Sequence, residues 1–467
     1  MTTLPQIDRI AVANAPVTKV RTGLPVPAIL YLLALVIPIG FNAGPLFLTL
    51  VRALLLVMVI PLLIRLLTGR YGRILATDIF FLLYLVWMTL ALAITSPAQV
   101  MTQSGSVGIE FIGGYLIGRA YIRDKGSFIA LCRWLTLLVL ILVPFALHET
   151  MTGRPLILEY IRRIPGLTSV SIVSIESRMG LERVQSVFAH PIHYGLFCSV
   201  AFSLCFVALK DVYSVPRRLI SSLLIMLSGF LALSSGALLA IILQIALIAW
   251  SLIFARIRWR WWLLVGLFAL AYVAIDILSS RPPIRVFMSY ATFSAHNAYW
   301  RGIIFDWGLK NVLGDASVDI PPAPWFGLGM NDWVRPWFMH SGSMDNFWLV
   351  IAVRYGIPAL LLLAAGYALA IYHVMRRNFD ADPLLLQIRR AWVLTFLGLT
   401  FTLCTVFVWT NIYSFVFFMF GAGIWLIAVP TTDPASGIPD SVPPGKPKER
   451  DTRPRHTRFP KPGAATV

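Results

Sequence analysis

The chain has 467 residues, of which 58% are hydrophobic and 13% are charged, and its mean hydropathy is +0.78. A soluble domain carries about 25% charged residues, so this composition excludes an ordinary soluble protein and indicates an integral membrane protein. The net charge of +18 would favour a nucleic-acid partner in a soluble protein; in a membrane protein, basic loops that fix orientation explain it, and we expect no nucleic-acid partner.

Apolar runs long enough to cross a bilayer as helices recur along almost the whole chain. The sequence does not show the short alternating strands of a membrane barrel. We predict an all-α membrane domain over 1–429, and a tail at 430–467 whose prolines and charges indicate disorder in the cytoplasm. About twelve transmembrane helices are predicted, at 27–42, 46–66, 78–96, 107–121, 127–147, 192–210, 218–234, 237–255, 261–277, 345–372, 391–409 and 411–428.

The basic residues between these spans predict the orientation of the chain. With the N-terminus inside, every short inner loop contains Lys or Arg, which is typical of cytoplasmic loops. The short outer loops, at about 43–45, 97–106 and 410, contain neither. Both termini are therefore expected in the cytoplasm, and two long loops, at about 148–191 and 278–344, are expected outside.

The two long outer loops are rich in arginine. They hold nine arginines and one lysine. Such cations can be ordinary loop surface, paired with the acids Glu159, Glu176, Glu182, Asp306 and Asp332. They can also form an anion site, because a planar guanidinium binds phosphate oxygens with two parallel hydrogen bonds. The basic residues are Arg154, Arg162, Arg163, Arg178, Arg183, Arg281, Arg285, Arg301, Arg335 and Lys310.

The second loop is also aromatic, which allows two interpretations. Tryptophans at the membrane surface form an interfacial belt. An aromatic face also suits the C–H face of a sugar ring. The residues concerned are Trp300, Trp307, Trp325, Trp333 and Trp337.

Four short motifs follow one another between about residues 180 and 375. They are "RVQSVFAHPIHYGLF" from Arg183, "LSSGALLA" at 233–240, "YWRGIIFDWGLKN" with the later "PWFGLGM", and "SMDNFWLVIAVRYGIPALL". In this order and with this topology, the chain resembles the family of O-antigen polymerases, O-antigen ligases and exopolysaccharide polymerases. The form is closest to repeat-unit polymerases of the exopolysaccharide or capsule type.

The resemblance implies a GT-C-like glycosyltransferase in a bacterial inner membrane, with its active site on the periplasmic face. Its donor would be an oligosaccharide on undecaprenyl pyrophosphate, transferred to an acceptor sugar hydroxyl without a cofactor. The alternatives are an O-antigen ligase that acts on the lipid A core, and a transporter of the lipid-linked oligosaccharide. Membrane lipids are expected partners, and a chain-length regulator or export proteins stay open as partners.

On this interpretation, three residues are catalytic: Arg301, Asp345 and His340. Arg301 would stabilise the leaving diphosphate, and Asp345 or His340 would accept the proton of the acceptor hydroxyl. The substrate-binding residues would be Arg183, Arg178, His190, His193, Arg281, Arg285, Arg335 and Asn346.

The sequence departs from the family pattern at two places. Ser235 stands where many relatives have an arginine, and Asp345-Asn346 replaces a His-Asn pair. The polar residues at this last helix, with Ser343, can alternatively serve as its N-cap.

Other polar residues keep a structural alternative. His190 and His193 can simply pack at the interface, and Arg354 can brace another helix. Arg52 and Glu110 lie within spans, where charge is costly and often functional; Arg52 can snorkel, and Glu110 can pair with a loop arginine or line a lipid groove. Neither long outer loop contains Asp-x-Asp, and no His/Cys cluster has metal spacing, so no metal site is expected.

Overall fold

The computed structural model describes residues 23–43, 46–290 and 295–430. The chain divides into two units, Met1–Ala428 and Val429–Val467, and nearly all described residues belong to the first. That unit is mostly helical and is an α-helical membrane protein by the length and composition of its helices. The predicted tail lies outside the described residues, apart from Pro430.

Nine helices within the described ranges are long and apolar enough to cross a membrane. Seven are single α-helices, and two are completed by a short turn of another helical type. The single helices are α2 (Leu50–Leu67), α3 (Ala76–Thr95), α6 (Lys125–Thr152), α10 (Ser235–Ile253), α11 (Arg260–Leu278), α14 (Phe347–Arg376) and α15 (Pro383–Leu403). The composite ones are α8 (Pro191–Ser203) with η3 (Leu204–Ala208), and α16 (Thr410–Gly421) with η5 (Ile424–Ile427).

The three other predicted spans have a different form. The first is the 11-residue helix α1 (Val26–Val36) and the seventh is the 17-residue helix α9 (Val215–Leu231). The fourth is a continuous helical stretch of α4 (Val100–Gly108), the π-helical turn η2 (Ile109–Gly113) and α5 (Gly114–Tyr121). The prediction of a loop at 97–106 is wrong, because the 3₁₀ turn η1 (Pro97–Gln99) leads directly into α4.

The first predicted span ends early because of a proline. Pro38 cannot continue a helix and disfavours helical backbone at Ile37, which is indeed extended. The chain then forms β1 (Ile39–Ala43), which pairs antiparallel with β2 (Leu46–Thr49) and with β3 (Thr168–Ser169) in the order β2-β1-β3. The expectation of a purely helical chain therefore missed three short strands, and the second span begins at Leu50 rather than at 46.

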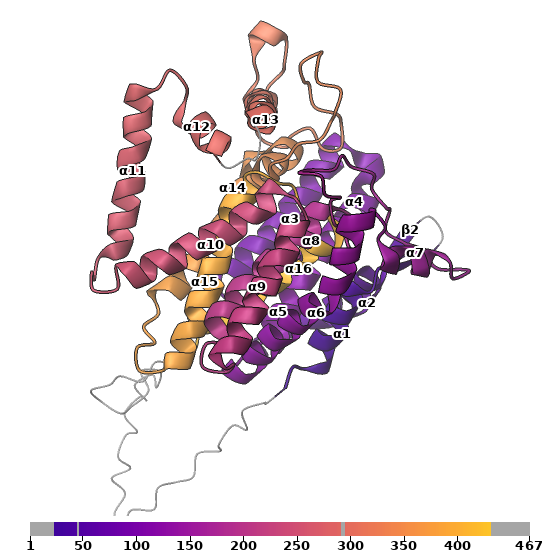
Figure 1. Ribbon diagram of the computed structural model, residues 1–467. Coiled ribbons are helices and arrows are strands. Elements are labelled where there is room, and N and C mark those ends of the chain that lie inside the picture. Colours follow the sequence, from indigo (N-terminus) through magenta and orange to yellow (C-terminus); the bar gives the residue numbers. More distant parts are fainter. Residues whose placement is uncertain (1–22, 44–45, 291–294, 431–467) are drawn as a thin grey trace, which may run out of the picture. The chain divides into compact units, whose positions relative to one another are not determined.

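Glycines allow close approach between helices in the bundle. α5 packs along α16, α3 along α14 and α10 along α15 (Figure 1). A Cβ at Gly114 or Gly118 would lie 2.3 Å or 2.1 Å from a carbonyl oxygen of α16, that of Ser414 or Phe418 respectively. This small-xxx-small spacing is a common contact between membrane helices, and it explains why so short a stretch as α5 is stably placed.

The two long loops contain structure of their own. The first carries α7 (Leu156–Arg162) and β3. The second carries α12 (Pro283–Tyr290), α13 (Ala295–Leu313) and η4 (Ala316–Val318) before α14 begins. α11 precedes the second loop, and none of its residues is buried within the protein, as suits a helix that faces lipid.

Candidate functional site

A buried carboxylate attaches the first long loop to the end of α6. Glu149, in the last turn of α6, accepts hydrogen bonds from the backbone N–H groups of Gln185 (2.8 Å) and Ser186 (3.0 Å). Both N–H groups follow Arg183 closely in the chain. Glu149 therefore fixes the backbone from which the Arg183 side chain extends.

The turn between α9 and α10 receives two arginines from distant parts of the chain. Leu233 in this turn has φ of 44°, a conformation that bulky side chains rarely adopt. The Nη1 of Arg178 donates to the carbonyl oxygen of Leu233 at 2.8 Å. From α13, the Nη2 of Arg301 donates to the hydroxyl oxygen of Ser235 at 3.4 Å. Ser235 therefore contacts an arginine that a distant part of the chain supplies.

The residue after the third arginine, Arg183, binds the end of α9 next to the same turn. The N–H of Val184, directly after Arg183, donates to the carbonyl oxygen of Leu231 at 3.1 Å. Three arginines that are separate in sequence therefore gather at one place. Arg178, Arg183 and Arg301 are called the arginine cluster below.

Burial opposes the positive charge of this cluster. The pKa of Arg183 is lowered to about 10, first by burial and then by the charge of Arg178, while the carboxylate of Asp345 acts in the opposite direction. The pKa of Arg301 is also lowered by burial and by Arg178, and again Asp345 opposes the shift. A guanidinium stays charged at any working pH, so both arginines keep their charge, and Asp345 is the carboxylate that acts on both.

Some hydrogen-bond donors of the arginine cluster have no acceptor among the described residues. Within the described ranges, none of its three guanidinium groups lies within ion-pair distance of a carboxylate. The Nε of Arg183 and the Nη1 of Arg301 are buried, and no described residue accepts a hydrogen bond from them. Buried donors are usually paired, so these groups are suited to bind an anion.

Two histidines and a tryptophan lie beside the cluster. His190 is the N-cap of α8, where its Nδ1 accepts the N–H of Ile192 at 3.1 Å. Burial lowers the pKa of His190 to about 4, and the charges of Arg183 and Arg178 add to this shift, so His190 is neutral at pH 7. The ring of Trp409 lies 4.0 Å from the ring of the buried His193, between centroids, and 5.7 Å from that of His190.

The polar residues before α14 have separate roles. Asn346 is the N-cap, and its Oδ1 accepts the N–H of Leu349 at 3.0 Å. Asp345 is half-buried and accepts only the Ser343 hydroxyl among the described groups, at 3.0 Å. His340 is exposed, and no hydrogen bond or ion pair joins it to the arginine cluster. The capping alternative therefore applies to Asn346, and Asp345 keeps a carboxylate oxygen for other chemistry.

The other predicted arginines lie on the surface of the second loop. Arg285 pairs with Asp306, and both side chains are more than a third exposed. The Nη1 of Arg335 contacts both carboxylate oxygens of Asp332 at 2.7 Å, and Arg281 is exposed. The structure does not bring these three into the arginine cluster. Arg285 and Arg335 instead have the acidic partners expected of ordinary loop surface.

The Gly-x-Gly motif of the second loop binds to a break in α14. Gly356 has φ of 84° inside this helix, so the helical hydrogen bonds are interrupted there. The N–H groups of Leu328 and Gly329 donate to the carbonyl oxygens of Val353 (2.7 Å) and Arg354 (2.9 Å). The loop thus satisfies backbone groups that the break would leave unpaired, as irregular backbone in a membrane protein requires.

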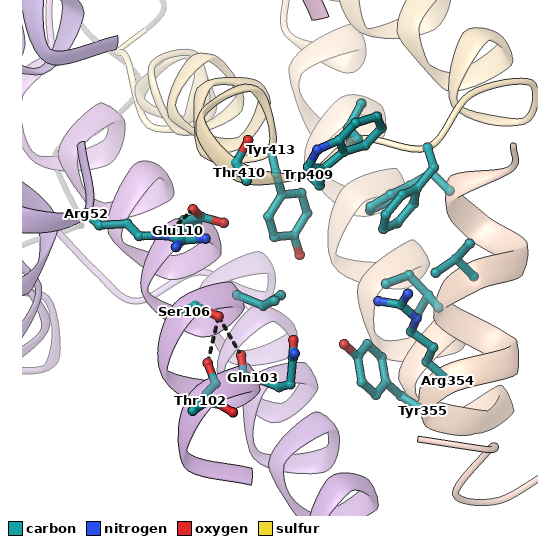
Figure 2. A pocket seen from close by; sticks show the side chains of 16 residues that line it. Arg52, Thr102, Gln103, Ser106, Glu110, Arg354, Tyr355, Trp409, Thr410 and Tyr413 are labelled. Atoms are coloured by element: carbon teal, nitrogen blue, oxygen red, sulfur yellow. Dashed lines mark hydrogen bonds and ion pairs between the residues drawn. The ribbon is translucent and has the colours of Figure 1, made fainter. Parts of the chain in front are cut away.

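A cavity of about 410 Å³ lies next to this break (Figure 2). Arg354 forms one wall, and Trp409 and Tyr413 at the start of α16 form another. On the far side Arg52 donates to Glu110 at 2.7 Å. Arg52 therefore does not snorkel, and Glu110 pairs with another helix rather than with a loop arginine. A second cavity, of about 420 Å³, shares Val350, Arg354 and Phe407 with the first.

Sequence reasoning missed Glu149 and Trp409 and left the role of Arg354 open. The sequence signal for Glu149 was its position as an ionisable residue at the end of an apolar run, where charge is costly and often functional. Trp409 stood between two predicted spans, and its contact with His193 depends on packing. For Arg354 the sequence left open a structural role, the bracing of another helix; the structure places it in the walls of both cavities.

The arrangement can hold an anion and accept a proton at neighbouring points. The arginine cluster supplies fixed positive charge, which is most effective in a partly dry site, and Asp345 supplies a carboxylate. Comparison of the chain with protein-family models and with curated proteins found no match.

Proposed function

We propose that this protein is a polysaccharide repeat-unit polymerase that uses a lipid diphosphate donor. The observation that supports the proposal most is the convergence of Arg178, Arg183 and Arg301 around one turn, within the electrostatic reach of Asp345. A diphosphate leaving group needs such preorganised cations, and an attacking hydroxyl needs a nearby base.

The proposed step is a single displacement at the anomeric carbon of the donor glycan. The acceptor hydroxyl oxygen forms a bond to this carbon as the carbon–oxygen bond to the diphosphate breaks. The electron pair leaves with the diphosphate, whose added charge the arginine cluster stabilises. The hydroxyl proton moves to Asp345.

The family resemblance supplies the wider setting of this proposal. It suggests a GT-C-like enzyme with about twelve spans, in a bacterial inner membrane, that takes undecaprenyl-pyrophosphate-linked oligosaccharide. The arginine cluster, Asp345 and the start of α16 belong to loops and helix ends that the basic-loop pattern assigns to the outside. A periplasmic active site fits this assignment.

An in vitro transfer assay tests the proposal. The purified protein is incubated with synthetic lipid-linked repeat units and a chelator, and products are separated on a gel. We expect a ladder of polymer on the lipid carrier, which Arg183→Ala or Arg301→Ala removes while Arg258→Ala, in the exposed inner loop, leaves it intact. Transfer only to lipid A core would instead identify a ligase, and movement across a vesicle with no new bond would identify a transporter.

A further inference from the structure

Arg354 is a cation without a matching acid beside it. Within the described ranges it forms no ion pair, and its guanidinium lies 5.6 Å from the centroid of the Phe407 ring. The cavity's other arginine, Arg52, is matched by Glu110. The cavity wall therefore carries one uncompensated positive charge, at Arg354.

The break in α14 holds Arg354 in a fixed position. Its carbonyl oxygen accepts the N–H of Gly329, and the N–H of Ile357 donates to Pro324 at 2.7 Å. From α3, the indole Nε1 of Trp87 donates to the carbonyl oxygen of Tyr355 at 3.1 Å. The backbone that carries Arg354 therefore needs little rearrangement when a ligand binds, which favours affinity.

The remaining wall of the cavity suits a sugar. Figure 2 shows the Arg354 guanidinium and the Tyr413 hydroxyl turned towards the same space, with Gln103 at its edge and the Trp409 ring above. The volume lies within the roughly 300–1,000 Å³ of small-molecule sites. Glu110, on the wall opposite Arg354, belongs to a π-helical turn, a feature that is frequent at functional sites.

Trp409 connects this cavity with the arginine cluster. It lines the cavity and also contacts His193. Burial and the charges of Arg183 and Arg178 lower the pKa of the nearby His190. The rings of Trp409 and His190 therefore lie between a saccharide in the cavity and the arginine cluster.

We propose that this cavity binds the acceptor saccharide and that Arg354 selects an acceptor that carries a carboxylate, such as a hexuronate. The proposal rests on the proposed function, because it assigns the acceptor of that reaction. It also identifies Arg354 as a specificity-determining residue, distinct from the arginine cluster.

Binding measurements test the selection without any turnover. The purified protein is titrated calorimetrically with a hexuronate-containing oligosaccharide and with its carboxyl-reduced counterpart. The carboxyl-reduced sugar lacks the charge-assisted hydrogen bond to Arg354, so we expect the acidic sugar to bind at least about tenfold more tightly. Arg354→Gln should remove this preference, whereas Arg354→Lys and the control Arg258→Gln should keep it.

Two results would overturn the assignment: equal affinity of the wild-type protein for the two sugars, or an unchanged preference in Arg354→Gln. A third arm uses inorganic pyrophosphate, and a larger loss of its affinity in Arg354→Gln than in Arg301→Gln would show that the cavity holds the diphosphate instead. If Arg354→Gln does not fold, Arg354→Met replaces it as the uncharged variant, and equal affinity of the wild-type protein for the two sugars still overturns the proposal. Failure of the proposed function would appear separately, as the absence of a new glycosidic bond in the transfer assay.

Discussion

Arg183 and Arg301 are positively charged where burial and a neighbouring arginine both oppose charge. Such a cluster is destabilising unless an anion offsets it, since like charges in a partly dry site repel strongly. Asp345 supplies part of that offset, and a bound diphosphate would supply the rest. The unpaired Nε of Arg183 and Nη1 of Arg301 are the donors we expect it to engage.

Substitution of Asp345 by Asn tests its role as the base. The amide keeps the shape but cannot take up a proton, so we expect a rate loss of about 10²–10⁴-fold. Donor affinity should be unchanged or tighter, because the cluster loses an opposing negative charge. Single-turnover rates and donor titrations, measured separately, distinguish the two effects. If His340→Asn, and not Asp345→Asn, removes the rate, then the base is His340.

His190 should make the protein less stable in mild acid. Its folded pKa of about 4 lies below the ordinary value of 6.5, so between these values the unfolded chain binds a proton that the folded one does not. The free energy of unfolding therefore falls as the pH drops from 6.5 towards 4, by at most about 3 kcal/mol. Thermal unfolding in detergent across this range measures the effect.

His190→Asn is the matched control for this pH dependence. Asn is a good N-cap, so α8 keeps its cap but loses the titrating group. The free energy of unfolding of this variant should depend less steeply on pH between 6.5 and 4. A slope identical to that of the wild type would show that other groups cause the acid sensitivity.

The sequence identified the polar residues of the site, but it did not identify the residues that they contact. Arg183, Arg301 and Asp345 stood in recognisable motifs. Their convergence could not be derived, because the contacts span 55 residues from Arg178 to Leu233 and 66 residues from Arg301 to Ser235. Glu149 carried no motif, and its role depends on where the first loop folds back.

α14 is the element on which both cavities depend. Its break at Gly356 is closed by the 324–329 segment, in which Gly327 lies close to the backbone of α14. A Cβ on Gly327 would lie 2.5 Å from the carbonyl oxygen of Val353, and its φ is 66°. Only glycine adopts this conformation at little cost.

Gly327→Ala should therefore loosen the second loop and destabilise the protein. Strained backbone of this kind costs about 1–3 kcal/mol, and the steric clash adds to it. We expect a lower melting temperature, measured by thermal unfolding in detergent. Gly266→Ala in α11, where an added Cβ meets nothing within 4 Å, is the control. Equal melting temperatures for the two variants would contradict this account of the break.

Element boundaries were predicted well where one apolar run forms one helix. α3, α10 and α11 begin and end within a few residues of their predicted spans. The predictions were wrong where local chemistry interrupts the run, as at Pro38, or where polar residues are helical, as at 97–106. The break at Gly356 carried only a weak signal, since Gly-Ile-Pro also occurs in continuous helices with a proline kink.

For the whole molecule, the basic-loop pattern predicts which ends face outwards. Single cysteines at the exposed positions Ser177 and Ser317 should react with a membrane-impermeant maleimide in intact bacterial cells. A cysteine at Ser214, before α9, should react only after permeabilisation. The background is Cys404→Ser, since Cys132, Cys198 and Cys205 are buried and Cys404 is exposed. Labelling of Ser214→Cys in intact cells would contradict the predicted orientation and the proposed location of the site.

The most direct test measures how tightly the arginine cluster binds a diphosphate. The affinity of the purified protein for undecaprenyl pyrophosphate, without any sugar, is measured by titration for the wild type, Arg183→Gln, Arg301→Gln and the control Arg258→Gln. We predict a loss of about tenfold or more for the two cluster variants, as expected for a lost charge-assisted hydrogen bond, and no change for the control. Wild-type affinity in both cluster variants would contradict the account.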